Sequence, residues 1–340
     1  GRFRLSLERE PDAFASGFGI ARSHDFIIAR DEHVADLDVN AEGTAVGVCE
    51  RIVHDAFVNG CAAPVPYIGA LRIAPGYRHR IGIIRGGFSA LRTVMREAGD
   101  PPFALTSIAS ENTTAMRLLT AGIRGLPRYE PLADYVTVML RPRRAGAQTT
   151  CNVSAAQNDE LDDAAAFLQE SLSRYQFAPR WSASDLACLE AYGLAPGNML
   201  CARVGSKIVG SIAVWDQRSA RQAVVRGYPK GIAATRPLLN AMAPISGMPR
   251  FPPVGAPIGM ASLSHLALAN EHDLETLDAL IAAALDLAQK RRLSAVAVGM
   301  ASDSPWLAAL KRRYRCVTYD TRLFLVHWPQ DGIDISAFRS

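Results

Sequence analysis

The sequence predicts an α/β (α+β) protein with two domains, each a mixed twisted sheet flanked by helices. Three observations carry this prediction. Segments with strand-like and helix-like spacing of apolar residues alternate along the chain. Their order in the first half returns in the second half. A polar segment with Pro and Gly, RPRRAGAQTT at residues 141 to 150, separates the halves. We therefore place one domain at residues 1 to 145 and a second, divergent domain at residues 151 to 330.

The first half reads as strand, strand, helix, strand, helix, strand. Alternating apolar positions predict the strands, and apolar positions three and four apart predict the helices, the first of which ends at a Gly. The strands are expected at residues 45 to 53, 67 to 73, 103 to 109 and 134 to 140, and the helices at 83 to 99 and 113 to 122.

The second half repeats this order. Strands are expected at residues 198 to 216 (a pair), 261 to 269, 294 to 300 and 321 to 328, and helices at 274 to 292 and 304 to 314. Residues 109 to 111 (ASE) superpose on residues 301 to 303 (ASD) at an offset of 192. We interpret the repeat as an internal duplication; a chance alternation of strands and helices is the alternative.

Composition excludes several classes of protein. With 49% hydrophobic and 21% charged residues, the 340-residue chain is typical of a globular protein. The longest apolar runs stop well short of the roughly 20 residues that span a bilayer, so no membrane partner is expected. Of 37 basic residues 33 are Arg, scattered without interleaved aromatics, so the net charge of +4 does not indicate nucleic-acid binding.

Cysteine and histidine spacing bear on compartment and metals. The six cysteines form no C-x-x-C pair and lie mostly in apolar stretches, which favours buried free thiols and a reducing cytoplasm. The histidines show no metal-ligand spacing, so no metal is expected. The sequence does not indicate an oligomeric state.

The most informative segment is YIGALRIAPGYRHRIGIIRGGFSALRTVM, in which a strand leads through a Pro-Gly turn into a helix. Free N–H groups at a helix start, together with the positive end of the helix dipole, form an anion site suited to a pyrophosphate. Arg78, His79 and Arg80 add positive charge to this loop. About thirty residues later a second strand runs into Asn112 and a short helix.

These residues resemble the GNAT superfamily of acyl-CoA-dependent N-acyltransferases. The first element matches at Leu71, Ile73, Pro75, Tyr77 and Arg78, and the second at Asn112, Ala115, Leu118 and Gly122. The resemblance covers about residues 45 to 140. It implies acetyl-CoA or another acyl-CoA as co-substrate and an amine acceptor, either a small molecule or a peptide. The residues that it assigns to the cofactor are Leu71, Arg72, Ile73, Tyr77, Arg78, His79, Arg80, Ile81, Gly82, Asn112 and Ala115.

The sequence departs from the family pattern at three places. The loop has Ile81 where a glycine is usual, with Gly82 displaced by one position. Leu119 stands where the family often has a tyrosine that protonates the leaving thiolate. Either Tyr129 donates the proton in its place, or the thiolate leaves unprotonated. In the second half, the loop equivalent to the anion site contains Glu271, Asp273 and Glu275, which would repel a pyrophosphate, so no CoA is expected there.

Two further candidates concern the acceptor. Glu50 is the candidate base that takes a proton from the amine; a surface or satisfied buried carboxylate is the alternative. Residues 213 to 229 are expected to form a strand pair that carries Trp215, Gln217, Arg221 and Tyr228, either as acceptor contacts or as the solvent face of a hairpin.

The sequence thus predicts an N-acyltransferase in which the first domain binds acyl-CoA. Two other functions stay open. One is a degenerate GNAT fold that acts as an acyl-CoA sensor or scaffold. The other is an aminoacyl-tRNA-dependent transferase, which would need a basic groove.

Overall fold

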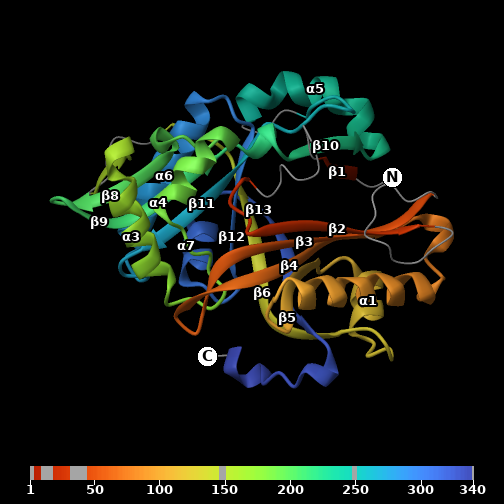
Figure 1. Ribbon diagram of the computed structural model, residues 1–340. Coiled ribbons are helices and arrows are strands. Elements are labelled where there is room, and N and C mark those ends of the chain that lie inside the picture. The colour runs from red at the N-terminus through yellow and green to blue at the C-terminus, as the bar shows by residue number, and fades with distance from the viewer. Residues whose placement is uncertain (1–3, 9–17, 31–43, 145–150, 247–250, 339–340) are drawn as a thin grey trace. The chain divides into compact units, whose positions relative to one another are not determined.

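The computed structural model describes residues 4–8, 18–30, 44–144, 151–246 and 251–338 (Figure 1). The chain divides into two compact units, neither of them continuous in sequence. The first unit comprises Ile20–Val136, Leu172–Arg180 and Tyr319–Ser340. The second unit comprises Gly1–Gly19, Thr137–Ser171 and Trp181–Thr318. Part of the expected linker, residues 145 to 150, lies outside the described residues, and the domain boundaries drawn there stay a prediction.

The first unit contains a mixed sheet in the order β2-β3-β4-β5-β13-β6. The β2–β3 and β3–β4 pairs are antiparallel, β4–β5 is parallel, and β5–β13 is antiparallel. The last strand of the chain therefore completes the sheet of the first unit. The strands are β2 (Ser23–Arg30), β3 (Ala45–Val58), β4 (Cys61–Ile73), β5 (Phe103–Ala109), β6 (Arg128–Leu140) and β13 (Cys316–His327), and the helices are α1 (Ile81–Glu97) and α2 (Thr113–Thr120).

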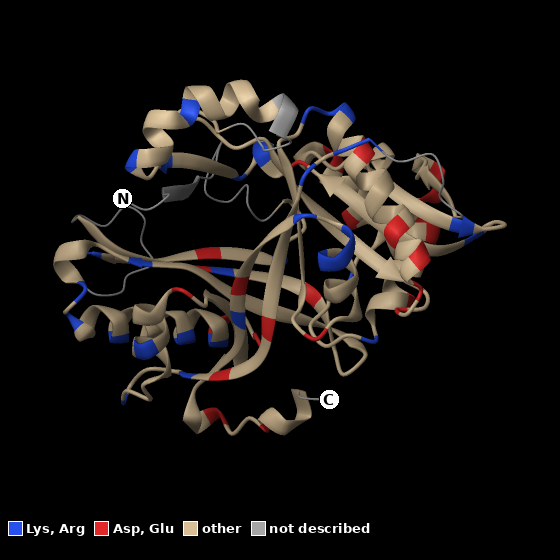
Figure 2. Ribbon diagram, turned by 180° about the vertical axis from the view of Figure 1, so that it is seen from behind, with Lys and Arg blue, Asp and Glu red and all other residues tan. Residues whose placement is uncertain are grey.

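The apolar face of α1 covers one face of this sheet. Its buried residues recur three and four positions apart, as the spacing predicted: Ile83, Ile84, Phe88, Leu91, Val94 and Met95. Four of them (Ile84, Phe88, Leu91 and Met95) pack with residues of β2, β3, β5 and β13, among them Ile27, Cys49, Ile108 and Phe324, in one core cluster. Ile83 packs in a second cluster with Ala29 and Val46. The outward side of α1 carries basic residues at intervals along the helix (Figure 2).

The second unit repeats this architecture. Its sheet has the order β12-β11-β9-β8-β7, and β11 pairs with β9 antiparallel and with β12 parallel. The strands are β7 (Asn152–Ala155), β8 (Met199–Val204), β9 (Lys207–Trp215), β10 (Gln222–Gly227), β11 (Met260–Leu268) and β12 (Ala295–Ala301). The helices are α3 (Leu161–Leu172), α4 (Ala183–Cys188), α5 (Lys230–Ser246), α6 (Leu274–Lys290) and α7 (Pro305–Arg313).

The prediction of a strand pair at residues 213 to 229 is wrong. After Trp215 the chain turns through a 3-10 helix (Gln217–Ser219). Asp216 caps this helix, because its carboxylate accepts from the N–H of Arg218 at 3.2 Å. The following strand, β10, pairs antiparallel with β1 (Arg4–Glu8) in a separate two-stranded sheet. Local alternation predicts a strand but not its partner.

The predicted fold class is confirmed. The two units are mixed α/β structures, and the expected strands and helices of both halves lie within two to three residues of their predicted positions, apart from longer β3, β4, β6 and β13. Sequence reasoning did not identify β1, β2, β7, α3, α4 and α5.

Candidate functional site

A β-bulge distorts β4 in the first unit. Along the β3–β4 pair, Val48 lies opposite Arg72 and Glu50 lies opposite Gly69, so a two-residue step on β3 matches a three-residue step on β4. The extra residue is accommodated at Ala70, whose φ of 52° is in the left-handed region. A bulge bends the strand and turns its following residues out of register with the neighbour.

Beyond the bulge, β4 separates from β5. The described residues pair across the two strands only at Tyr67 and Leu105, and just beyond them the Thr106 hydroxyl donates to the carbonyl oxygen of Ile68 at 2.7 Å. On the other side of β4, the N–H of Ala74 donates to the carbonyl oxygen of Val46 at 2.8 Å. Because N–H directions alternate along a strand, the N–H of Ile73 points away from β3 and toward the gap.

A cleft of about 710 Å³ lies at this end of β4; residues of β3, β4, α1 and α2 line it, and we call it the β4–β5 cleft. Six of the residues predicted for the cofactor line it: Leu71, Arg72, Ile73, Arg78, Asn112 and Ala115. The others, Tyr77, His79, Arg80, Ile81 and Gly82, are in the adjoining loop and the first residues of α1 and are not part of the lining. The structure thus brings the two predicted motifs to one cleft.

The start of α1 is an open, positively charged helix N-terminus. Arg80 occupies the N-cap without a side-chain cap hydrogen bond, and no acidic residue lies in the first turn. A Cβ placed on Gly82 would meet no atom within 4 Å, so the space outside the helix is clear there. The Arg78 guanidinium donates to the carbonyl oxygen of Ile73 at 3.3 Å, and that of Arg80 lies 4.8 Å from the centroid of the Tyr77 ring. These are the features of an anion site.

The start of α2 forms the opposite wall of the cleft. Asn112 is its N-cap residue, and its side-chain oxygen accepts from the N–H of Ala115 at 3.2 Å. This contact explains why the motif pairs an asparagine with a residue three positions later. Leu119 is buried and also lines the cleft, so the position expected for a tyrosine is apolar here.

The corresponding helix start in the second unit is filled by its own side chain. Asp273 is the N-cap of α6, and its carboxylate accepts from the N–H of Thr276 at 3.0 Å and from the Thr276 hydroxyl at 2.7 Å. Glu275 adds a second negative charge in the first turn. This arrangement stabilises the helix and leaves no vacant site for an anion.

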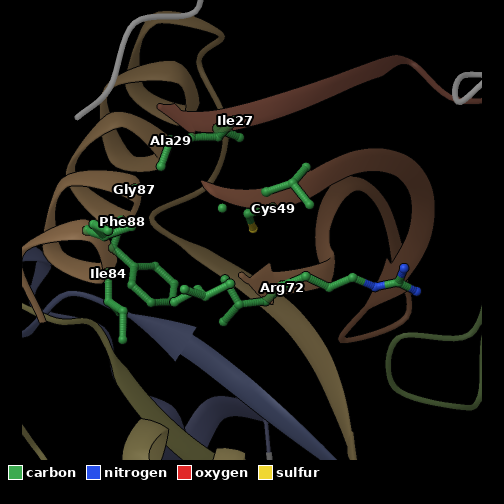
Figure 3. A pocket seen from close by; sticks show the side chains of 12 residues that line it. Ile27, Ala29, Cys49, Arg72, Ile84, Gly87 and Phe88 are labelled. Atoms are coloured by element: carbon green, nitrogen blue, oxygen red, sulfur yellow. The ribbon is translucent and has the colours of Figure 1, made fainter. Parts of the chain in front are cut away.

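A small apolar pocket of about 30 Å³ adjoins the cleft, and Figure 3 shows it from close by. It lies between α1 and the strands β2, β3 and β4, and we call it the small pocket. It shares with the cleft the residues Gly47, Val48, Leu71, Arg72, Ile73 and Ile84, and adds Ile27, Ala29, Cys49, Ile83, Gly87 and Phe88.

Glu50 forms a buried pair with His24. Its Oε1 lies 2.9 Å from Nε2 of His24 on the neighbouring strand β2, and the side chains are 4% and 8% exposed. Oε2 of Glu50 lies 3.3 Å from the position of a Cβ on Gly69, the residue before the bulge. The predicted base thus lies beside the distorted part of β4, with a histidine partner that sequence reasoning missed. It is not among the residues that line the cleft or the small pocket, and its role as a base stays a prediction.

Tyr129 lies in the core of the first unit. Its ring packs edge-on against Phe88 and Phe324, with centroids 6.3 and 6.0 Å away, and it lines neither the cleft nor the small pocket. Burial, with a smaller contribution from Cys49, raises the pKa of its hydroxyl above the usual value for tyrosine. The role of Tyr129 as proton donor stays a prediction, and this burial gives it no support.

The four residues expected at the acceptor are in the second unit. The Trp215 indole donates to the carbonyl oxygen of Tyr192 at 2.9 Å, and the Tyr228 hydroxyl donates to that of Pro252 at 2.7 Å. Arg221 donates to the Gln217 side-chain oxygen at 2.8 Å. These contacts stabilise the unit internally, and an acceptor role for the four residues stays a prediction.

The described residues contain neither a membrane-spanning helix nor a cluster of potential metal ligands. No helix there has the length and apolar character needed to cross a membrane. No group of three or more His, Cys, Asp or Glu among them is arranged to hold a metal ion.

Comparison with known proteins identifies structural neighbours. No family model and no curated protein matches the sequence. The fold is similar to Saccharomyces cerevisiae N-myristoyltransferase with bound myristoyl-CoA, at a TM-score of 0.54 and 12% identity over 84% of this chain and 64% of that one. A second structure of that enzyme, with myristoyl-CoA and inhibitors, gives 0.56 and 10% identity, covering 97% and 84% of the two chains.

A bacterial neighbour covers the whole chain. The GCN5-related N-acetyltransferase from Sphaerobacter thermophilus has a TM-score of 0.54 at 13% identity and covers 98% of both chains. These similarities show that the chain shares the fold of N-myristoyltransferase and of a GCN5-related N-acetyltransferase. At such low identity they establish the fold alone.

Proposed function

We propose that the first unit binds an acyl-CoA in the β4–β5 cleft and that the protein transfers the acyl group to an amine. The observation that carries the proposal is the separation of β4 from β5 after Tyr67, which opens a cleft of about 710 Å³ against an uncapped, basic helix start. A pocket with a free strand edge and an anion site at one end suits an elongated molecule with a pyrophosphate.

The proposed binding mode follows the lining of the cleft. The pyrophosphate lies at the loop and helix start, Tyr77 to Gly82, where Arg78 and Arg80 add charge. The thioester lies along Leu71 to Ile73, and its carbonyl oxygen accepts from a backbone N–H at the free edge of β4. That hydrogen bond stabilises the negative charge that develops on the oxygen during attack.

The proposed reaction is direct transfer. The amine nitrogen attacks the thioester carbon, a C–N bond forms, and the C–S bond breaks so that CoA leaves as a thiolate that takes up a proton. Glu50, positioned by His24 and lying beside Gly69, accepts the proton of the amine. Holding the amine against the thioester supplies most of the rate enhancement in this scheme.

We further propose one CoA site per chain. The Asp273 cap and the charge of Glu275 occupy the helix start of the second unit.

The predicted cytoplasmic location suits the six free cysteine thiols.

The binding part of the proposal is tested with the whole chain. Acetyl-CoA should raise the melting temperature, because a ligand that binds only the folded state stabilises it. Calorimetric titration should give one molecule bound per chain. Absence of both effects with acetyl-CoA, butyryl-CoA and free CoA would refute the proposed site; two molecules per chain would refute the exclusion of the second unit.

A second candidate function is acyl-CoA binding without transfer. The observation in its favour is the buried Leu119 in the cleft, at the position expected for a tyrosine, while Tyr129 lies in the core. The described residues that line the cleft therefore include no tyrosine to protonate the thiolate. Release of free thiol from acetyl-CoA in the presence of a panel of small amines and peptides distinguishes the two functions. A binder would shift its melting temperature and release no thiol.

A further inference from the structure

The small pocket is a branch of the β4–β5 cleft at the point where the reacting carbonyl is proposed to lie. The two cavities meet at Leu71, Arg72 and Ile73 on the free part of β4. The small pocket lies beneath the first two turns of α1, where Ile83, Ile84, Gly87 and Phe88 line it. An acyl group whose carbonyl lies at Leu71 to Ile73 would therefore have the small pocket beside it.

The lining of the small pocket carries no charge that faces inward. Ile27, Ala29, Ile84 and Phe88 line it, whereas the Arg72 side chain extends its guanidinium away from them (Figure 3). The one polar side chain among them besides Arg72 is the thiol of Cys49, and burial next to Glu50 raises its pKa to about 12, so it is neutral. Such a lining favours an apolar occupant.

Gly87 keeps this space open. It lies in the middle of α1, where a glycine destabilises a helix by about 1 kcal/mol relative to alanine. A Cβ built on Gly87 would meet no atom within 4 Å, so the packing of the protein itself does not require a glycine. An alanine would strengthen the helix and reduce the pocket; the glycine instead leaves room for a ligand.

The size of the pocket limits its occupant. Its volume of about 30 Å³ compares with the roughly 10 to 15 Å³ that admits one water, so it holds about two atoms of the size of a methylene or methyl group. An acetyl methyl would fill only about half of this space, and a long chain would need the core around Phe88 and Cys49 to rearrange.

We propose that the small pocket selects a short saturated acyl group of about three to four carbons, such as propionyl or butyryl, over acetyl and over long chains. This inference rests on the proposed function, since it concerns the acyl group of the proposed co-substrate. It names a chemical class for that group and assigns chain-length selection to Gly87.

Calorimetric titration of the full chain with CoA, acetyl-CoA, butyryl-CoA and octanoyl-CoA tests the inference. Each buried methylene strengthens binding about fourfold, and the pocket has room for about one group more than the acetyl methyl, so butyryl-CoA should bind about fourfold more tightly than acetyl-CoA. Octanoyl-CoA should bind no more tightly than butyryl-CoA. Gly87→Val should abolish the preference for butyryl over acetyl while leaving the affinity for CoA unchanged.

Two controls accompany this measurement. Gly87→Ala fits without a clash and favours the helix, so it should raise the melting temperature and reduce the preference for butyryl-CoA over acetyl-CoA. This variant keeps the test valid if Gly87→Val fails to fold. Gly231→Ala in α5, another helical glycine with no atom within 4 Å of its Cβ position, should keep the full preference.

The outcomes separate the inference from the proposed function. Two results would overturn the inference and leave the CoA site intact. One is equal affinity for acetyl-CoA and butyryl-CoA. The other is that octanoyl-CoA binds most tightly both to the native chain and to Gly87→Ala. If none of the four compounds bound, the proposed function would fail and the inference with it.

Discussion

Ala70 and His265 occupy the same structural position in the two units. Each has a φ of 52° and lies where a central strand loses register with its antiparallel neighbour. In the second unit Ser264 lies opposite Ala213 and Ala267 opposite Ser211, so β11 carries the extra residue just as β4 does. Each strand pairs with the next parallel strand only before its bulge, β4 at Tyr67 and β11 at Met260 to Ser262.

This correspondence gives the predicted duplication a specific structural counterpart. A non-glycine residue in the left-handed region is uncommon, and it persists only where the surrounding structure enforces it. The two bulges differ in their surroundings: Ala70 adjoins an open cleft, whereas His265 is buried with its ring centroid 4.2 Å from that of Trp181.

The buried His265 should make the stability of the protein depend on pH. Desolvation lowers its pKa to about 3, whereas the unfolded state has a pKa of about 6.5. Below pH 6.5 the unfolded chain therefore binds the proton more readily, and the free energy of unfolding falls as the pH drops, by up to about 1.4 kcal/mol per pH unit. Urea unfolding between pH 7.5 and 5.5 measures this slope.

The matched variant for that experiment is His265→Asn, because asparagine tolerates a positive φ. It should have a lower stability at pH 7.5 and a shallower pH dependence than the native protein. Identical slopes in the two proteins would show that His265 does not titrate on unfolding.

Removal of charge from the loop before α1 should weaken CoA binding. Arg78→Ala combined with Arg80→Ala removes two cations from the proposed pyrophosphate site and should reduce the affinity about 10- to 100-fold, given typical energies of charged hydrogen bonds. The loss should shrink as salt is added. The control is Arg312→Ala in α7, an exposed arginine of the second unit. Unchanged affinity of the double variant would contradict the placement.

Glu50→Gln should reduce the rate of transfer without reducing the affinity for CoA. An amide has nearly the shape of the carboxylate but accepts no proton at neutral pH, so a fall of about 100-fold or more is expected, with loss of the acidic limb of the pH–rate profile. Thiol release from acyl-CoA with a reactive amine is the measurement. Glu97→Gln, at an exposed carboxylate in the last turn of α1, should keep the native rate and profile. A native profile in Glu50→Gln would exclude the proposed base.

Arg51 should be among the residues most important for the stability of the first unit. Its side chain is 1% exposed; its Nε donates to Asp100 at 2.7 Å, and its guanidinium also binds Ser23 at 2.6 Å and Asp25. Arg51→Leu leaves the buried Asp100 carboxylate without its cation and should cost about 3 to 5 kcal/mol of unfolding free energy.

The less buried partner provides the comparison. Asp25 is 37% exposed, so Asp25→Asn should cost much less than Arg51→Leu in the same urea titration. Equal losses for the two variants would show that burial of the Arg51–Asp100 pair is not the cause.

The sequence by itself determined the local elements and their chemistry. The local signals are the alternation in residues 67 to 73, the turn at Pro75 and the asparagine three residues before Ala115. Each is encoded within a few neighbouring positions, so β4, the loop and the start of α2 could all be predicted. The acidic helix start at Asp273 was predicted in the same way, because capping is a local interaction.

Only the tertiary structure decided which distant segments meet. The partner of Glu50 is His24 on β2, the neighbour of β5 is β13 from the end of the chain, and β10 pairs with β1 and not with β9. The physical reason is that a strand presents the same hydrogen-bonding groups to any partner, so pairing depends on packing across the whole unit. The open space beside Gly87 likewise depends on which strands lie beneath α1, and periodicity alone does not specify it.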